Sequence, residues 1–255
     1  MPNNMQLELA ILSKRGGRSY NEDACGHWHS DSHLCCVVAD GAGGHGGGDK
    51  ASKLAVQHMI SGYAASPTST PDAIERLVRR TNDSIIAHRE DDPAQSHMHS
   101  TVVSLFIDLD AQTAAWGHCG DSRLYGFRSG RIEAQTRDHS LVQSLVDSGM
   151  LTADKMRTHP QRSELLSALG TTDDDLMVSV AEQPWPLQAG DVFLLCTDGL
   201  WEYVEEGEMQ DALAAASGPH AWLDTLERAV LRNAAHKPSH DNFSALTVWV
   251  SDPGP

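Results

Sequence analysis

Apolar and polar residues alternate near the start of the chain, and a period of two predicts a β-strand there. Leu7, Leu9 and Ile11 are the apolar members of this pattern. Short apolar runs bounded by turn residues predict further strands. They lie at residues 34–39, 101–107, 113–118, 124–127, 132–134, 177–181, 192–196 and 244–250. Turn-forming residues at 108–111 and 129–130 separate two pairs of these runs, so antiparallel hairpins are expected.

Apolar residues at helical spacing occur in two blocks. In the first block, one helix begins near Asp49 and a second begins at Thr70-Pro71, where Thr is a favourable cap and Pro suits the first turn. The second block covers about 204–216 and 220–235. A short helix after Ser140 lies between the blocks. Residues 89–99 are predicted to be a loop.

The order of these elements predicts the α+β class, with helices covering antiparallel sheets, because the strands follow one another as hairpins and the helices are grouped. No linker, internal repeat or low-complexity tract interrupts residues 1–255, so a single domain is expected. The stretch from about 150 to 170 is irregular and contains Pro160. We expect it to form a flap.

The charge of the chain excludes one class of function. Its 255 residues carry a formal net charge of -16, whereas general nucleic-acid binding requires a basic face. No apolar run reaches the 18 residues of a membrane helix, and the start has no signal sequence, so we expect a protein of the cytoplasm without a membrane partner. The five cysteines include no CxxC pair, which fits buried, reduced thiols.

Acidic residues stand at the ends of several predicted strands. Asp40, Asp121 and Asp198 follow predicted strands, and Asp241 precedes the last one. Glu22 and Asp23 follow the Gly16-Gly17 turn and are expected to join the same site. Asp40-Gly41 and Asp198-Gly199 share one setting, since each follows an apolar strand and precedes a helix. Carboxylates brought together without a cation would repel one another, whereas Mg²⁺ or Mn²⁺ favours such an oxygen-rich shell. Zinc fits less well, because the histidines lack paired spacing.

The glycine-rich stretch after Asp40 has several interpretations. Its glycines permit a sharp turn and leave a carbonyl free to approach a cation. A plain strand-turn-helix connection with a solvated Asp40 explains the stretch equally well when it is considered alone. A phosphate-binding P-loop is excluded, because Asp49 stands where that motif requires Lys.

Six motifs together carry a family resemblance. They are Arg18-x-x-Asn21-Glu22-Asp23, Asp40-Gly41-x-Gly43-Gly44-His45, Gly120-Asp121-Ser122-Arg123, Asp138-His139-Ser140, Cys196-Thr197-Asp198-Gly199-Leu200-Trp201 and Asp241-Asn242. Their order and spacing over residues 6–250 resemble those of the type-2C (PPM) metal-dependent serine/threonine protein phosphatases of the compact bacterial kind. The resemblance implies a β-sandwich of two antiparallel sheets flanked by helices on both sides, with a metal site at one end.

The resemblance also implies roles for individual residues. Asp40 would bridge two Mn²⁺ or Mg²⁺ ions, and the Gly41 carbonyl would complete one shell. Glu22 or Asp23 would hold one ion, and Asp198 and Asp241 the other. Asp121, with Asp198, would support a possible third ion. Arg18 would bind the substrate phosphate with its planar, two-pronged group.

The implied reaction is hydrolysis of phosphoserine and phosphothreonine by a metal-activated water. Phosphorylated proteins would be the partners, and the enzyme, expected to be a monomer, would oppose a serine/threonine kinase. Two alternatives remain: a non-catalytic relative that binds phosphoproteins, and a phosphatase of small molecules. The complete set of acidic residues favours the active protein phosphatase.

One departure from the family leaves the proton donor unassigned. Many eukaryotic members carry His directly after the Asp-Gly pair, where this chain has Ala42. His45 is the nearest histidine, and we expect it to have a structural role in the turn. Asp138-His139-Ser140 cannot form a catalytic triad, because the three residues are consecutive, and Ser140 is expected to cap the next helix. Arg123 is expected to pair with acidic residues rather than with phosphate.

Overall fold

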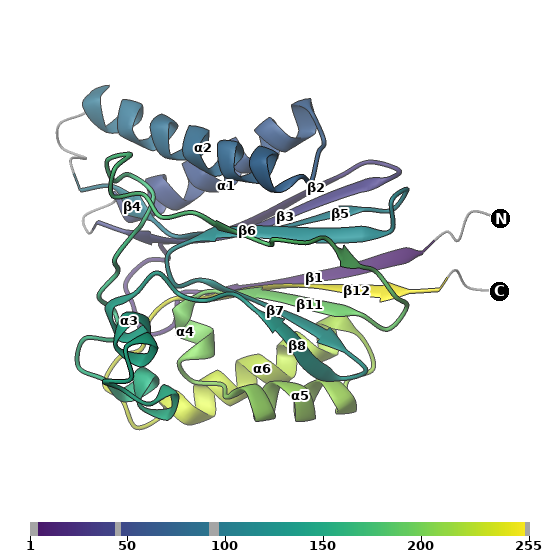
Figure 1. The fold of residues 1–255 in the computed structure, drawn as a ribbon. Helices are drawn as coiled ribbons and strands as arrows, with labels where there is room; N and C mark the ends of the chain where they lie inside the picture. The colour runs from purple at the N-terminus through teal and green to yellow at the C-terminus, as the bar shows by residue number, and fades with distance from the viewer. Residues whose placement is uncertain (1–4, 44–46, 92–96, 253–255) are drawn as a thin grey trace.

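Two antiparallel sheets lie face to face in the computed structural model, and helices cover both outer faces (Figure 1). The structure describes residues 5–43, 47–91 and 97–252. This arrangement confirms the α+β class and the β-sandwich flanked by helices on both sides. No helix within these ranges is both long and apolar enough to cross a membrane.

The first sheet joins the two ends of the described chain. Its strands run in the order β1 (Gln6–Lys14), β12 (Phe243–Ser251), β11 (Val192–Cys196), β7 (Arg123–Arg128) and β8 (Arg131–Gln135). Strands β1 and β12 pair along their whole lengths, from Gln6 opposite Ser251 to Lys14 opposite Phe243. The first described strand therefore lies beside the last.

The second sheet contains one long strand that the hydrophobic pattern did not reveal. Its strands are β2 (Asp23–His29), β3 (His33–Ala42), β5 (Val102–Asp108), β6 (Thr113–Cys119) and β10 (Trp185–Pro186), with β4 (His99–Ser100) and β9 (Ser179–Val180) as short additions. Strand β2 was missed because it is an edge strand with exposed histidines at 27 and 29. It brings Asp23 directly opposite Asp40.

Each sheet has its own helical cover (Figure 1). Helices α1 (Gly48–Ala65) and α2 (Pro71–Asp91) lie on the second sheet, and α4 (Asp198–Trp201), α5 (Glu206–Ala215) and α6 (Pro219–Ala234) lie on the first. Helix α2 continues through Arg89, where a loop was predicted. Helices α5 and α6 lie close to the predicted ranges 204–216 and 220–235, and α4 is an additional short helix that begins at Asp198.

Three apolar layers hold the sandwich together. In β3, alternate residues face opposite ways, so that Leu34, Cys36 and Val38 pack between the sheets whereas Cys35 and Val37 pack under α1. The third layer lies between the first sheet and α5 and α6, around Trp222 and Phe127. Burial on both faces explains why β3 is apolar at every position from Leu34 to Ala39.

All five cysteines are free thiols, and Cys35 and Cys36 are buried as predicted.

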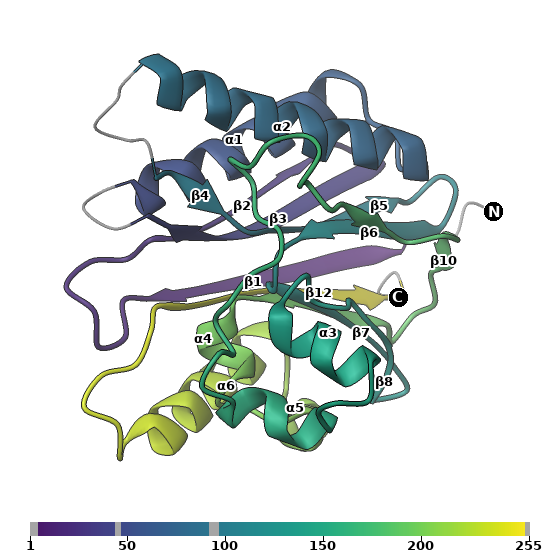
Figure 2. The same cartoon turned by 60° about the vertical axis from the view of Figure 1, so that its left-hand side comes forward.

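The stretch predicted to be a flap connects the two outer layers. It contains a 3₁₀ helix, η2 (Ala153–Thr158), which follows the short helix α3 (Leu141–Asp147). From there the chain crosses the end of the sandwich and reaches the layer of α1 and α2 (Figure 2). There the Gly170 N–H donates to Asn82 Oδ1 at 2.7 Å, and Arg89 Nη1 donates to the Gly170 carbonyl at 2.7 Å.

Replacement of Trp222 tests the layer under α6. Its indole packs edge-on against Phe127 at a centroid distance of 5.3 Å and donates to the Met209 carbonyl at 3.2 Å. We expect Trp222→Ala to lower the free energy of unfolding by about 3–5 kcal/mol, because a large buried cavity forms. Trp222→Phe should cost clearly less. Denaturant unfolding measures both, and equal losses would contradict this account of the packing.

Candidate metal centre

The predicted site residues meet in one cavity of about 260 Å³, where β3 and β11 end and the two sheets open. The described residues that line it are Arg18, Glu22, Asp40, Gly41, Ala42, Thr101, Asp121, Ser163, Leu165, Asp198, Asp241 and Asn242. Every predicted site residue except Asp23 is among them. Segments that are far apart in the sequence therefore converge at this cavity. The acidic residues at strand ends had predicted a shared site of this kind.

Hydrogen bonds to its backbone hold Asp40 in place. Its N–H donates to Thr101 Oγ1 at 3.0 Å, and its carbonyl accepts from the Thr101 N–H at 2.8 Å and from Ser100 Oγ at 3.0 Å. Thr101 Oγ1 also lies 2.6 Å from Ser122 Oγ, so the positions of β3 and the Asp121 turn are linked. Sequence reasoning missed Thr101, because nothing in its neighbourhood marks this contact.

Gly41 is required by the close approach of two other segments. A Cβ at this position would lie 2.0 Å from the Gly48 carbonyl oxygen and 2.7 Å from that of Glu22. The Gly41 N–H donates to the same Glu22 carbonyl at 3.2 Å. The glycine thus brings the start of α1, the end of β3 and Glu22 together at the cavity.

Asn242 fixes the turn that carries Arg18 and Glu22. Its Oδ1 accepts from the Glu22 N–H at 2.8 Å, and its Nδ2 donates to the carbonyls of Arg15 at 2.7 Å and Tyr20 at 2.9 Å. Arg18 Nη2 then lies 2.6 Å from Asp241 Oδ2. The sequence identified Asn242 as part of a motif but not as the residue that holds this turn.

Asp23 lies behind the cavity instead of lining it. It is 7% exposed, and its Oδ2 accepts a hydrogen bond from Thr197 Oγ1 at 3.0 Å. Thr197 directly precedes Asp198 in the chain. Gly199 permits the close approach of helix α4 to Asn242, because a Cβ at position 199 would lie 1.9 Å from the Asn242 carbonyl oxygen. Of the acidic pair Glu22 and Asp23, Glu22 is the one whose side chain faces the cavity.

The carboxylates raise one another's pKa values. Burial and the neighbouring Asp23, Asp198, Asp121 and Asp241 hold the pKa of Asp40 well above its usual range. Burial, followed by Asp121, does the same for the pKa of Asp198. Burial also raises the pKa of Asp23 to about 7, and burial together with Asp138 raises the pKa of Asp121 to about 7. The cavity therefore favours a positive charge.

Divalent cations fit this donor set. Glu22 Oε1, Asp23 Oδ1 and Asp198 Oδ1 are buried without a hydrogen-bond partner. Among the described lining residues, Arg18 is the one cation beside five carboxylates. Oxygen donors of this kind suit Mg²⁺ or Mn²⁺. Within the described ranges, no three His, Cys, Asp or Glu side chains lie close enough together to form a ready-made chelate.

The other polar motifs have structural roles in the described residues. Ser140 Oγ accepts from the Gln143 N–H at 3.3 Å and caps α3, as predicted. Arg123 forms a two-pronged pair with Asp138, as expected of a residue that does not bind phosphate. Ala42 lines the cavity, and His45 lies outside the described residues. Ser163 and Leu165 of the 150–170 stretch also line the cavity, which no local signal predicted.

Comparisons with known proteins agree with this geometry. The family model of Protein phosphatase 2C matches residues 13–237. The serine/threonine phosphatase stp of Listeria welshimeri is 33% identical over 237 residues, which cover 91% of this chain and 90% of the relative. Serine/threonine phosphatase Stp1 of Staphylococcus aureus has a similar solved structure, with a TM-score of 0.82, 28% identity, and coverage of 100% of this chain and 98% of that chain.

A second solved structure contains metal ions. It is the catalytic domain of the serine/threonine protein phosphatase PstP in complex with two manganese ions. Its TM-score is 0.79 at 27% identity, and the match covers 97% of this chain and 100% of that chain.

The raised pKa of Asp121 predicts how the metal-free protein responds to pH. Between the usual value of 3.8 and about 7, native Asp121 retains a proton that the unfolded chain releases, so stability falls as pH rises through this range. We expect metal-free Asp121→Asn to be more stable than the wild type at pH 8, with the advantage lost near pH 4.

Denaturant unfolding in the presence of a chelator measures this difference. The exposed carboxylate Asp174 provides the control, and Asp174→Asn should match the wild type at both pH values. A metal-free Asp121→Asn protein that is less stable than the wild type at pH 8 would show that Asp121 is not under electrostatic strain.

Proposed function

The chain belongs to the protein phosphatase 2C family and is a protein serine/threonine phosphatase, and we propose that the acidic cavity at the open end of the sandwich is its metal-dependent active site. The observation that carries this proposal is the convergence of five carboxylates and Gly41 on one cavity beside Arg18. Buried carboxylate oxygens without partners support a site for cations.

We propose that Asp40 lies between two cations. Its position near the end of strand β3 supports this role, because Asp23 lies opposite it on β2 and its pKa responds to Asp198, Asp121 and Asp241. Glu22 and the Gly41 carbonyl would hold one ion, Asp198 and Asp241 the other, and Asp121 with Asp198 a third. Bound Mn²⁺ or Mg²⁺ would activate a water at neutral pH and offset the charge of the phosphate.

Arg18 is proposed to bind the phosphate of the substrate. Its side chain is 56% exposed and extends over the cavity, where it now pairs with Asp241. A guanidinium can donate two parallel hydrogen bonds to phosphate oxygens, and it remains protonated throughout. Arg123 cannot take this role, because its donors are already directed to Asp138 and Tyr125.

The described lining of the cavity contains no histidine, so we propose that solvent supplies the proton to the leaving serine or threonine oxygen. Ala42 lines the cavity and takes the place of the histidine that many eukaryotic members carry. Thr101 and Ser163 also line the cavity and would orient water rather than transfer a proton, since a hydroxyl group is a weak acid.

We propose that the substrates are phosphorylated proteins and that the enzyme opposes a serine/threonine kinase. The whole chain would act as one catalytic domain and as a monomer, with residues 150–170 as a flap over the site. The contribution of Ser163 and Leu165 to the cavity supports that role for the flap. Five unpaired thiols support action in the cytoplasm.

Release of phosphate from a phosphothreonine peptide tests the proposed function. We expect turnover that requires Mn²⁺ or Mg²⁺, ceases with EDTA, and falls roughly 100-fold or more in a folded Asp198→Asn variant, because a metal ligand is lost. Activity on small phosphomonoesters alone would favour a small-molecule phosphatase. No turnover by folded, metal-loaded protein on several phosphopeptides would favour a non-catalytic phosphoprotein binder.

Replacement of Arg18 tests phosphate binding separately. Loss of a charge-assisted hydrogen bond predicts that Arg18→Ala raises KM about 10- to 100-fold, with a smaller effect on kcat. Steady-state kinetics on the same peptide measure both. Arg15→Ala is the matched control, because Arg15 is exposed on the same turn but does not line the cavity. Equal effects of the two variants would indicate that the turn, rather than the Arg18 guanidinium, is responsible.

A further inference from the structure

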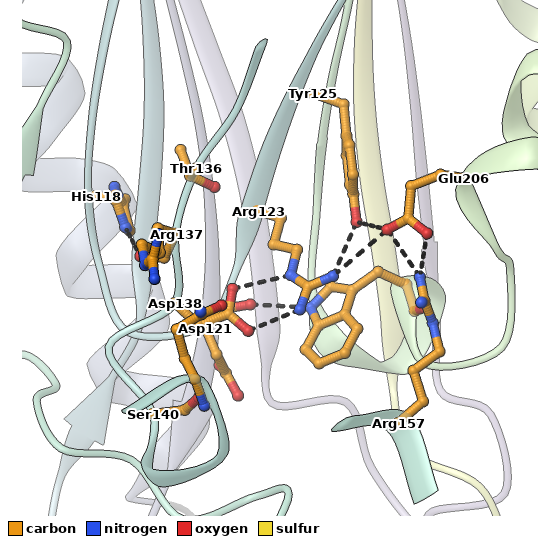
Figure 3. Close-up of polar contacts among 12 residues, drawn as sticks. His118, Asp121, Arg123, Tyr125, Thr136, Arg137, Asp138, Ser140, Arg157 and Glu206 are labelled. Atoms are coloured by element: carbon orange, nitrogen blue, oxygen red, sulfur yellow. Dashed lines mark hydrogen bonds and ion pairs between the residues drawn. The ribbon is translucent and has the colours of Figure 1, made fainter. Parts of the chain in front are cut away.

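A buried cation lies directly behind the metal centre. Arg123 Nε and Nη2 donate to the two oxygens of Asp138, each at 2.8 Å, and both side chains are almost fully buried (Figure 3). The guanidinium carbon of Arg123 lies 3.6 Å from the centroid of the Trp201 ring. A buried ion pair of this kind contributes little net stability but restricts geometry when every donor is satisfied. Here the pair fixes the plane of the indole.

Trp201 in turn holds the backbone of Asp121. Its Nε1 donates to the Asp121 carbonyl at 2.9 Å, and the indole is 1% exposed. Trp201 is also the last residue of α4, the helix that begins at Asp198. One rigid aromatic side chain therefore links the two acidic residues proposed to hold the third ion.

The other contact to Trp201 comes from the 3₁₀ helix η2. Arg157 Nε donates to the Trp201 carbonyl at 2.8 Å, while its Nη2 pairs with Glu206 at 2.9 and 3.0 Å (Figure 3). Glu206 also accepts from Tyr125 Oη at 3.2 Å, and Tyr125 accepts from Arg123 Nη1 at 3.1 Å. The network is thus continuous from η2 to Asp121.

We propose that Arg157 and Trp201 are positioning residues that couple docking of the segment 153–158 to binding of a divalent cation at Asp121. When η2 is docked, Arg157 and Arg123 hold Trp201 from two directions, and Trp201 holds Asp121 against the repulsion of Asp138 and Asp198. The inference rests on the proposed role of Asp121 as a metal ligand. Neither Arg157 nor Trp201 lines the metal cavity, so their effect would pass through Asp121 and Asp198, the two acidic residues that Trp201 links.

Thermodynamic linkage gives this coupling two observable sides. If docking of η2 strengthens cation binding, then cation binding must stabilise docking of η2 by the same factor. A purely structural role for Arg157 predicts neither effect, because an ion pair that only stabilises the fold acts equally on the metal-free and metal-bound forms.

The chain contains a matched control pair. Arg128, at the other end of β7, forms a two-pronged pair with Asp191 at 2.9 and 2.8 Å and donates to the Pro186 carbonyl at 2.7 Å. Its guanidinium carbon lies 4.4 Å from the Trp185 ring centroid, and its side chain is 21% exposed against 19% for Arg157. Arg128→Gln therefore removes an equivalent set of contacts remote from the cavity.

The test measures Mn²⁺ binding to the metal-free protein by the electron paramagnetic resonance of free Mn²⁺. We expect Arg157→Gln and Trp201→Phe to weaken the weakest Mn²⁺ site at least about fivefold, and Arg128→Gln to leave it unchanged. Trp201→Phe keeps an aromatic ring under Arg123 and removes the indole N–H together with the second ring, so it tests the link to Asp121 even if Arg157→Gln misfolds.

Hydrogen exchange measures the reciprocal effect. Saturating Mn²⁺ should slow amide exchange in residues 153–158 of the wild type and of Arg128→Gln, but not of Arg157→Gln or Asp121→Asn. Wild-type Mn²⁺ binding by Arg157→Gln and Trp201→Phe, with only a loss of thermal stability, would overturn the coupling. Unchanged Mn²⁺ binding by Asp121→Asn would instead overturn the role of Asp121 as a ligand, on which the coupling rests.

Discussion

Carboxylates that share a buried cavity repel one another, and this repulsion is the constraint that the rest of the structure must meet. Asp40, Asp198 and Asp121 are held together by elements that are stable for other reasons. Three apolar layers stabilise the sheets, and the sheets fix the strand ends. Hydrogen bonds at the site go mainly to backbone groups, which leaves carboxylate oxygens free for a cation.

Arg18 and Arg123 show how environment separates chemical roles. Arg123 is buried, and Asp138, Tyr125 and Trp201 occupy its donors and its flat face. Arg18 is exposed on a turn and has one carboxylate partner. The same guanidinium group is therefore a fixed internal support in one place, and in the other it is the hydrogen-bond donor that we propose for the substrate phosphate. Exposure decides between these roles, and sequence position alone does not reveal it.

The sequence revealed the parts of the site that local patterns encode. Asp40 and Asp198 were recognisable because each ends a strand that is buried on both faces and is therefore apolar at consecutive positions. Strand β2 was not recognisable, because an edge strand with exposed histidines has few apolar positions. The roles of Thr101, Asn242 and Ser163 at the site were not predicted, for another reason. Their roles depend on which distant segment lies opposite them, and no local spacing carries that information.

The pairing of β1 with β12 determines when the active centre can form during synthesis. Asn242 must reach Glu22, Arg15 and Tyr20, more than 200 residues earlier, before the turn that carries Arg18 is fixed. Strand β12 also lies between β1 and β11, so the first sheet has a gap until β12 is inserted. The proposed metal centre of a nascent chain is thus incomplete until β12 has emerged. We therefore expect a chain that lacks β12 to be inactive on phosphoproteins.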